Sequence, residues 1–210
     1  MIARHGTRAL AAALVLGLGL GGCVTLLPTS QPVQLYRFDV QTAETPPAGG
    51  ADAGAFEVYR ATTGFAHGAD GDQLLTATGD QVAYIAGARW IAPASQLFDE
   101  AESHAFDRSG GPARLARRGE VGHAKVGLRL DVESFEVRYV DGPGAAPTVV
   151  VQVRASLDRV ADRQVIASQM FESRKKATGN TVSAIVPEFD AALTDVLGQV
   201  VAWTNAKGAG

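Results

Sequence analysis

The sequence predicts a single α/β domain, in which a mixed and largely antiparallel sheet is packed by an early helix and a long C-terminal helix. Two long segments, 125–140 and 148–159, alternate apolar with polar residues and are joined by the short connection 141–147. A third strand is expected at 164–172, so three neighbouring strands form an antiparallel meander. From Val182 onward, apolar residues recur every three or four positions, which is typical of an amphipathic helix.

Shorter strands are expected before this meander. Apolar and polar residues alternate imperfectly at 33–40, and 55–60 is a second short candidate. The pair Gly79–Asp80 lies between two strand-like segments, 72–78 and 81–85. A two-residue turn of this kind predicts a β-hairpin.

A helix is predicted after the hairpin. Pro93 suits its first turn, and the run Gly110-Gly111-Pro112 ends it. One face of this helix is apolar and the acidic residues are expected to point outward; the apolar set is Ala94, Leu97, Phe98, Ala101 and Ala105, and the acidic set is Asp99, Glu100 and Glu102.

Two irregularities are also expected. The apolar alternation of 125–140 changes phase near Ser134, which predicts a β-bulge or bend. In the C-terminal helix, whose apolar stripe ends at Trp203, Pro187 marks either the start of the helix or a kink. Asn180 is the candidate N-cap if the helix starts before Pro187.

The N-terminus has the pattern of an export signal. The basic segment 1–7 precedes Ala9–Leu20, an apolar run too short to cross a bilayer core of ~30 Å but suited to a secretory signal. Leu20-Gly21-Gly22-Cys23 then resembles a lipobox, so we expect cleavage after Gly22 and a covalent lipid, with palmitate among its acyl chains, on Cys23. The alternative is an ordinary signal peptide that leaves the chain's one cysteine free, and an unpaired cysteine in an exported protein needs a reason.

These observations divide the chain into a signal peptide (1–22), a lipidated tether (23–32) and a folded domain (33–206). Without the signal peptide, 17 lysines and arginines face 22 acidic residues, a net charge of −5, which argues against nucleic-acid binding. Because Val24 rather than an aspartate follows Cys23, the expected location is the periplasmic face of the outer membrane.

Motifs for catalysis, metals or cofactors are not found, and we expect no enzyme and no cofactor apart from the lipid. A Gly-x-Gly-x-x-Gly pattern falls inside the signal peptide, where no strand precedes it. The segment from Asp70 begins like a calcium loop, but its twelfth position is Gln81 rather than Glu. The remaining histidines of the mature chain lack partners at metal-ligand spacing: His67, His104 and His123.

Two segments are candidate partner interfaces. Trp90 beside Arg89 has the composition of an interface anchor, and the alternative is a packed residue at the helix entry. Arg174, Lys175 and Lys176 could contact an acidic partner or lipid headgroups. The alternative for these three cations is simple exposure to solvent between a strand and a helix.

The order of several short motifs resembles the ABC-type transport auxiliary lipoprotein family. The motifs are Cys23, Leu35-Tyr36-Arg37-Phe38, Gln81-Val82-Ala83-Tyr84 leading to Ala88-Arg89-Trp90, the helix with Leu97 and Phe98, the strand containing Ser168–Phe171, and Ala202-Trp203 in the last helix. The stretch 61–72 and Pro187 fit this family less well.

The resemblance implies a non-enzymatic subunit of an MCE-type lipid transport system. Such a subunit would dock or stabilise a periplasmic MCE-domain protein, while a separate ABC permease and ATPase supply transport and energy. Alternatives are a lipid-binding shuttle with an internal apolar cavity, or a structural lipoprotein of another envelope assembly. A homo-oligomer is compatible with each of these roles, but no residue requires one.

Overall fold

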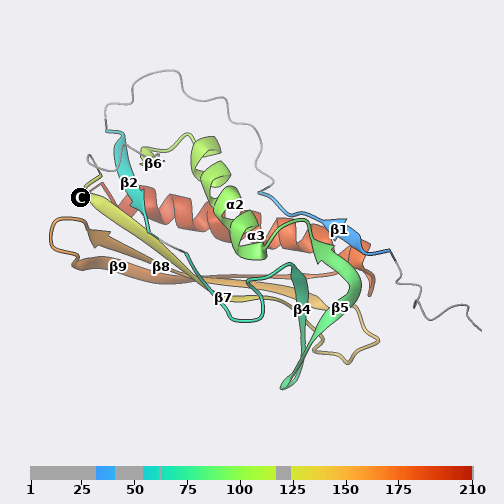
Figure 1. Ribbon diagram of the computed structural model, residues 1–210. Helices are drawn as coiled ribbons and strands as arrows, with labels where there is room; N and C mark the ends of the chain where they lie inside the picture. The colour runs from blue at the N-terminus through green and yellow to red at the C-terminus, as the bar shows by residue number, and fades with distance from the viewer. Residues whose placement is uncertain (1–31, 41–53, 62, 117–123, 210) are drawn as a thin grey trace, which may run out of the picture. The chain divides into compact units, whose positions relative to one another are not determined.

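The computed structural model describes residues 32–40, 54–61, 63–116 and 124–209. Its folded unit spans Val33–Gly210 and contains one nine-stranded sheet with two helices on one face (Figure 1). The prediction of a single α/β domain with a mixed sheet, an early helix and a long C-terminal helix is therefore confirmed. The predicted lipobox, with Gly22 and Cys23, lies outside the described residues.

Strand β7 (Val126–Arg138) organises the sheet. Along one edge it pairs antiparallel with β8 (Thr148–Arg159), and β8 pairs antiparallel with β9 (Val165–Lys176). Along its other edge β7 pairs in parallel with three successive shorter strands: β2 (Phe56–Arg60), β3 (Gly64–Phe65) and β4 (Gln73–Thr78). Because β7 joins these two sets of strands, its residues lie at the centre of the domain.

Two strands complete the edges. The predicted hairpin at Gly79–Asp80 joins β4 to β5 (Gln81–Trp90), which curves toward the helices in Figure 1 and pairs in parallel with β1 (Gln34–Tyr36). β6 (Ala113–Leu115) pairs with β2. The expected strand at 33–40 is wrong in its length, because after Tyr36 the chain leaves β5 and runs between the helices instead.

Helices α2 (Ala94–Arg108) and α3 (Val182–Lys207) cover the same side of the sheet (Figure 1). The apolar stripe of α3 packs on β8 and β9, and α2 packs on α3 and β6. Neither helix of the described residues has the length and apolar character that a bilayer crossing requires. The space between the layers is filled by aliphatic side chains of β7, β8 and α3 and by an aromatic cluster, Phe38, Trp90, Phe135 and Phe189.

The predicted irregularities are resolved. The register of β7 and β8 shifts between Val132 and Ser134, which confirms the expected bulge. α3 begins before Pro187, with Thr181 rather than Asn180 at the N-cap position. Asn180 instead accepts a hydrogen bond from the Tyr139 hydroxyl and donates one to the Pro143 carbonyl.

Candidate functional site

Trp90 is a core residue, so the prediction that it anchors a partner at the surface is wrong. Its side chain is 2% exposed, and its indole packs edge-on against the rings of Phe38 and Phe189, with centroids 4.9 and 5.1 Å away. The alternative, a packed residue at the helix entry, is the one that the structure has. Arg89 remains half-exposed and donates hydrogen bonds to both carboxylate oxygens of Asp72, at 2.9 Å. Asp72, which belongs to the segment that begins like a calcium loop, is therefore the ion-pair partner of Arg89.

The three cations Arg174, Lys175 and Lys176 lie in β9, which extends beyond the predicted end at 172. Arg174 pairs with Glu172 at 2.5 Å, Lys175 with Asp195 of α3 at 3.0 Å, and Lys176 with Asp141 at 3.1 Å. These pairs are partly exposed, and isolated exposed ion pairs contribute little to stability.

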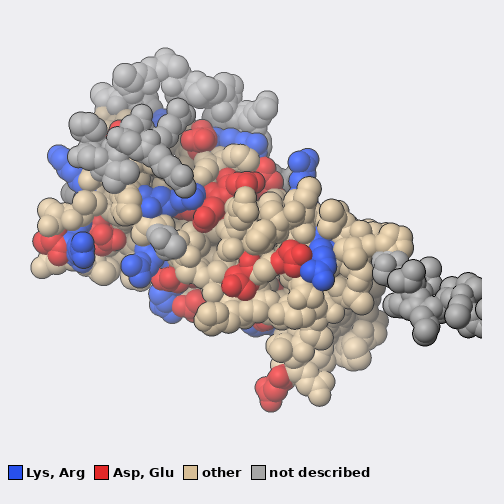
Figure 2. All heavy atoms as spheres, viewed as in Figure 1, with Lys and Arg blue, Asp and Glu red and all other residues tan. Residues whose placement is uncertain are grey.

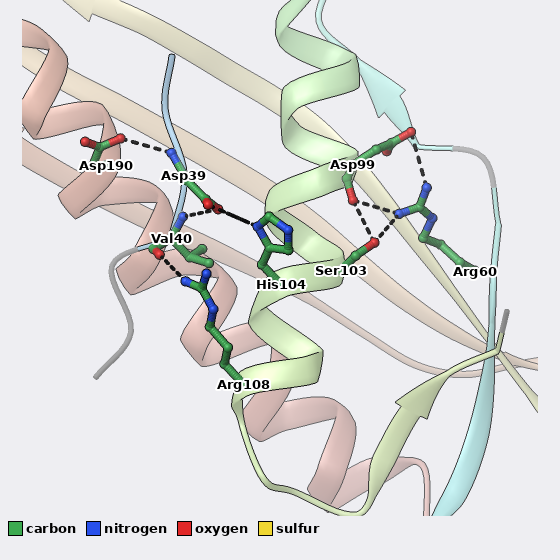
Figure 3. Close-up of polar contacts among 8 residues, drawn as sticks. All are labelled: Asp39, Val40, Arg60, Asp99, Ser103, His104, Arg108 and Asp190. Atoms are coloured by element: carbon green, nitrogen blue, oxygen red, sulfur yellow. Dashed lines mark hydrogen bonds and ion pairs between the residues drawn. The ribbon is translucent and has the colours of Figure 1, made fainter. Parts of the chain in front are cut away.

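A polar cluster that was not predicted from the sequence surrounds α2 (Figure 3). On one side of the helix, the Arg60 guanidinium donates hydrogen bonds to the Asp99 carbonyl at 2.8 Å and the Ser103 hydroxyl at 3.1 Å. The Thr63 hydroxyl donates to the Asp99 carboxylate at 2.7 Å. These contacts connect β2 and the start of β3 to the middle of α2.

Glu102 lies next to this cluster and is fully buried, so the expectation that it points outward is wrong. Burial raises the pKa of its carboxyl to about 8, and Arg60, 3.5 Å away, offsets this only in part. At neutral pH the carboxyl is therefore mostly protonated, although its distance to Arg60 fits an ion pair. Arg60 also forms an ion pair with Asp99, whose carboxylate lies 3.5 Å away.

On the other side of α2, His104 holds the segment that follows β1. Its Nδ1 lies 3.0 Å from both carboxylate oxygens of Asp39. The Asp39 amide donates to the Asp190 carboxylate of α3 at 3.1 Å, and Arg108 donates to the Val40 carbonyl at 3.1 Å. Asp39 therefore connects both helices, as Figure 3 shows. The groove beside these residues has a volume of about 590 Å³ and is lined by both charged and apolar side chains.

The contacts of this cluster tie α2 to β2, to α3 and to the segment after β1. A histidine beside an aspartate is two-thirds of a nucleophilic triad, but the hydrogen bonds of His104 among the described residues go to Asp39 alone. The nearby Ser103 hydroxyl donates to the Asp99 carbonyl of its own helix. Within the described ranges, no group of three or more His, Cys, Asp or Glu residues is placed to hold a metal ion. His67 is exposed in a turn, and His123 lies outside the described residues.

The family model for the ABC-type transport auxiliary lipoprotein component matches residues 36–201. The chain belongs to this family. The resemblance that the sequence motifs indicated is therefore confirmed. Lipoproteins of this family are membrane-anchored proteins of the cell envelope. A comparison with curated proteins finds no relative.

Solved structures share the fold of this auxiliary lipoprotein. Protein XCC0632 from Xanthomonas campestris is 24% identical with a TM-score of 0.70, over 83% of this chain and 96% of its own. An uncharacterized protein is 13% identical with a TM-score of 0.63, over 82% and 99%. The hypothetical protein CT253 from Chlamydia trachomatis is 10% identical with a TM-score of 0.50, over 73% and 97%. At these identities the likeness shows the fold alone.

The cluster around α2 could not be found from the sequence of the auxiliary lipoprotein. Its contacts between elements join residues 36 to 151 positions apart, such as Thr63 to Asp99 and Asp39 to Asp190. One weak signal was present, because Glu102 immediately follows Ala101, which is on the apolar stripe. A carboxylate at the border of the apolar stripe of a helix can be buried where an arginine from a neighbouring strand lies close to it.

Proposed function

We propose that this chain is the lipid-anchored auxiliary subunit of an MCE-type lipid transport system at the periplasmic face of the outer membrane. In this role it docks or stabilises the periplasmic MCE-domain protein, which works with a separate ABC permease and ATPase. The family match over 36–201 carries the proposal, because the family is defined as an auxiliary component of ABC-type transport.

The lipobox and the mature N-terminus support the membrane part of the proposal. Cys23 is the chain's one cysteine and follows Leu20-Gly21-Gly22, so lipidation gives it a use. Several acyl chains, at ~0.8 kcal/mol per buried CH₂, make such an anchor stable. Val24 in place of an aspartate favours the outer membrane.

The cation cluster at the end of β9 is the proposed docking surface. Arg174, Lys175 and Lys176 end one edge strand, and each is paired with a carboxylate of the same chain at the surface. A partner with a matching acidic patch can replace these carboxylates, because exposed pairs exchange at little cost. Charges arranged in this way accelerate encounter and select the partner more than they raise affinity.

Affinity purification of the tagged full-length protein from detergent-solubilised envelopes tests the proposal. We expect an MCE-domain protein, an ABC permease and an ATPase among the recovered partners. Recovery of a different envelope complex in their place would contradict the transport role and favour a structural lipoprotein.

A pair of matched variants tests the docking surface. Arg174→Ala with Lys175→Ala removes two ion-paired cations at one end of the sheet, whereas Arg154→Ala with Arg159→Ala removes two ion-paired cations from β8. Recovery of the MCE-domain protein should fall in the first variant only. Equal recovery in both variants would place the docking surface elsewhere.

A further inference from the structure

An exposed apolar surface lies where the folded unit begins. In the parallel pair of β1 and β5, Leu35 is level with Arg89, and the Ile91 amide donates to the Tyr36 carbonyl, which extends the same register. Tyr36 and Trp90 point into the core, so the alternate residues Val33, Leu35 and Ile91 share the opposite side. They are 48%, 62% and 61% exposed.

The surroundings of these three side chains suit a phospholipid surface. Arg89 is level with Leu35 on the same side of the strands, and Arg37 directly follows β1, so cations that can meet a headgroup phosphate lie next to the apolar residues. Arg37 is exposed and makes no ion pair with another described residue, while Arg89 is paired with Asp72. Figure 2 shows that the end of the molecule with β1 and the β4–β5 hairpin is mostly uncharged in this view.

The chain between Cys23 and the fold limits what this surface can meet. Ten Cα–Cα steps lead from Cys23 to Val33, which span at most about 35 Å when fully extended. With a lipid on Cys23, the start of β1 is therefore held within this distance of the bilayer. Val33 at that point and Leu35 on β1 are both exposed apolar residues.

From these observations we infer that Val33, Leu35 and Ile91 form a membrane-contacting surface, which rests on the phospholipid headgroup region of the bilayer that holds Cys23. This inference deepens the proposed function and rests on its lipid anchor. It orients the domain, because β9 and its cations lie at the opposite edge of the sheet, with β5, β4, β7 and β8 between. The docking cations are then presented away from the lipid.

A depth measurement on the full-length lipidated protein tests this orientation. Because lipid blocks the sulfur of Cys23, a cysteine introduced by Leu35→Cys or Ile91→Cys can be labelled selectively with an environment-sensitive fluorophore. Val165→Cys is the matched control, since Val165 is 65% exposed and begins β9 at the opposite edge. The labelled proteins are reconstituted into phosphatidylethanolamine–phosphatidylglycerol vesicles that contain a lipid spin-labelled near the headgroup.

We expect spin-label quenching at positions 35 and 91 to exceed that at 165 by about twofold or more, as interfacial burial of an apolar surface requires. Adding Leu35→Asp should reduce quenching at position 91 to the level of the control, whereas Val165→Asp should leave it unchanged.

Equal quenching at all three positions in protein that floats with the vesicles would overturn the orientation alone. Failure to float would overturn the lipid anchor, and with it this inference. Blue-shifted but unquenched labels at 35 and 91 would show that protein rather than lipid covers the surface, and would also overturn it.

Discussion

The carboxyl group of Glu102, which has no exposed surface, lies 3.5 Å from the guanidinium of Arg60, and neither of its oxygens has a hydrogen-bond partner among the described residues. Arg60 directs its hydrogen bonds to Asp99 and Ser103 instead. Burial therefore dominates over the nearby positive charge, and the pKa of Glu102 rises from 4.5 to about 8.

This shift makes the stability of the domain depend on pH in the neutral range. Between the unfolded pKa of 4.5 and the folded pKa of about 8, the unfolded chain has lost the Glu102 proton while the folded chain keeps it. Folding stability therefore falls as the pH rises through this window, by up to about 3 kcal/mol at pH 7. Glu102→Gln should remove this dependence, which urea denaturation at pH 5.5, 7 and 8 would measure.

Glu100→Gln is the control for this pH series. Glu100 lies on the same helix and is exposed, so its substitution should leave the wild-type slope in place. A Glu102→Gln variant that loses stability with rising pH as steeply as the wild type would show that Glu102 is ionised in the folded protein.

Substitution of Trp90 should act on folding. Trp90→Ala removes a buried indole from the cluster of Phe38, Phe135 and Phe189, and such truncations cost about 3–5 kcal/mol. Arg89→Ala breaks only a half-exposed ion pair and should cost no more than about 1 kcal/mol. Chemical denaturation of both variants compares them. Nearly equal losses would mean that the indole is not part of the core.

The sequence predicted those elements whose signal is local. The Gly79–Asp80 hairpin, the bulge before Ser134 and the extent of β8 at 148–159 follow from turn chemistry and side-chain alternation over a few residues. β3 and β6 were not predicted because they have only two and three residues, and a parallel pair is defined by a distant strand.

The misassigned side chains have a similar cause. Trp90 was left as either an interface anchor or a packed residue because it lies beside Arg89, and Glu102 was expected to point outward because it is acidic. Their burial depends on Phe38, Phe189 and Arg60, which come from other elements. Only the positions of those partners in space could have corrected the assignment.

The segment after β1 should become more mobile when its link to α2 is removed. Asp39→Ala deletes the contact with His104 and the hydrogen bond from the Val40 amide to the Asp39 carboxylate. Both His104 and Asp39 are partly exposed, so the global loss should stay near about 1 kcal/mol. Hydrogen exchange of the Val40 amide should accelerate, while that of the β8 amides should not. Unchanged exchange at Val40 would show that Arg108 and the buried Phe38 hold the segment without Asp39.

Asp195 should give the domain a stability that is lost in acid. The Ser173 hydroxyl and the Lys175 ammonium donate hydrogen bonds to its carboxylate and hold its pKa below the usual 3.8. A carboxylate with a lowered pKa stabilises the fold above pH 3.8, and this contribution disappears as the pH falls through the folded pKa. Asp195→Asn should therefore be less stable than the wild type at pH 7, and the difference should shrink by pH 3.

Asp80→Asn, at the exposed hairpin turn, is the control in urea denaturation at both pH values. A deficit of Asp195→Asn that is as large at pH 3 as at pH 7 would show that the link between β9 and α3 depends on the shape of the side chain rather than on its charge.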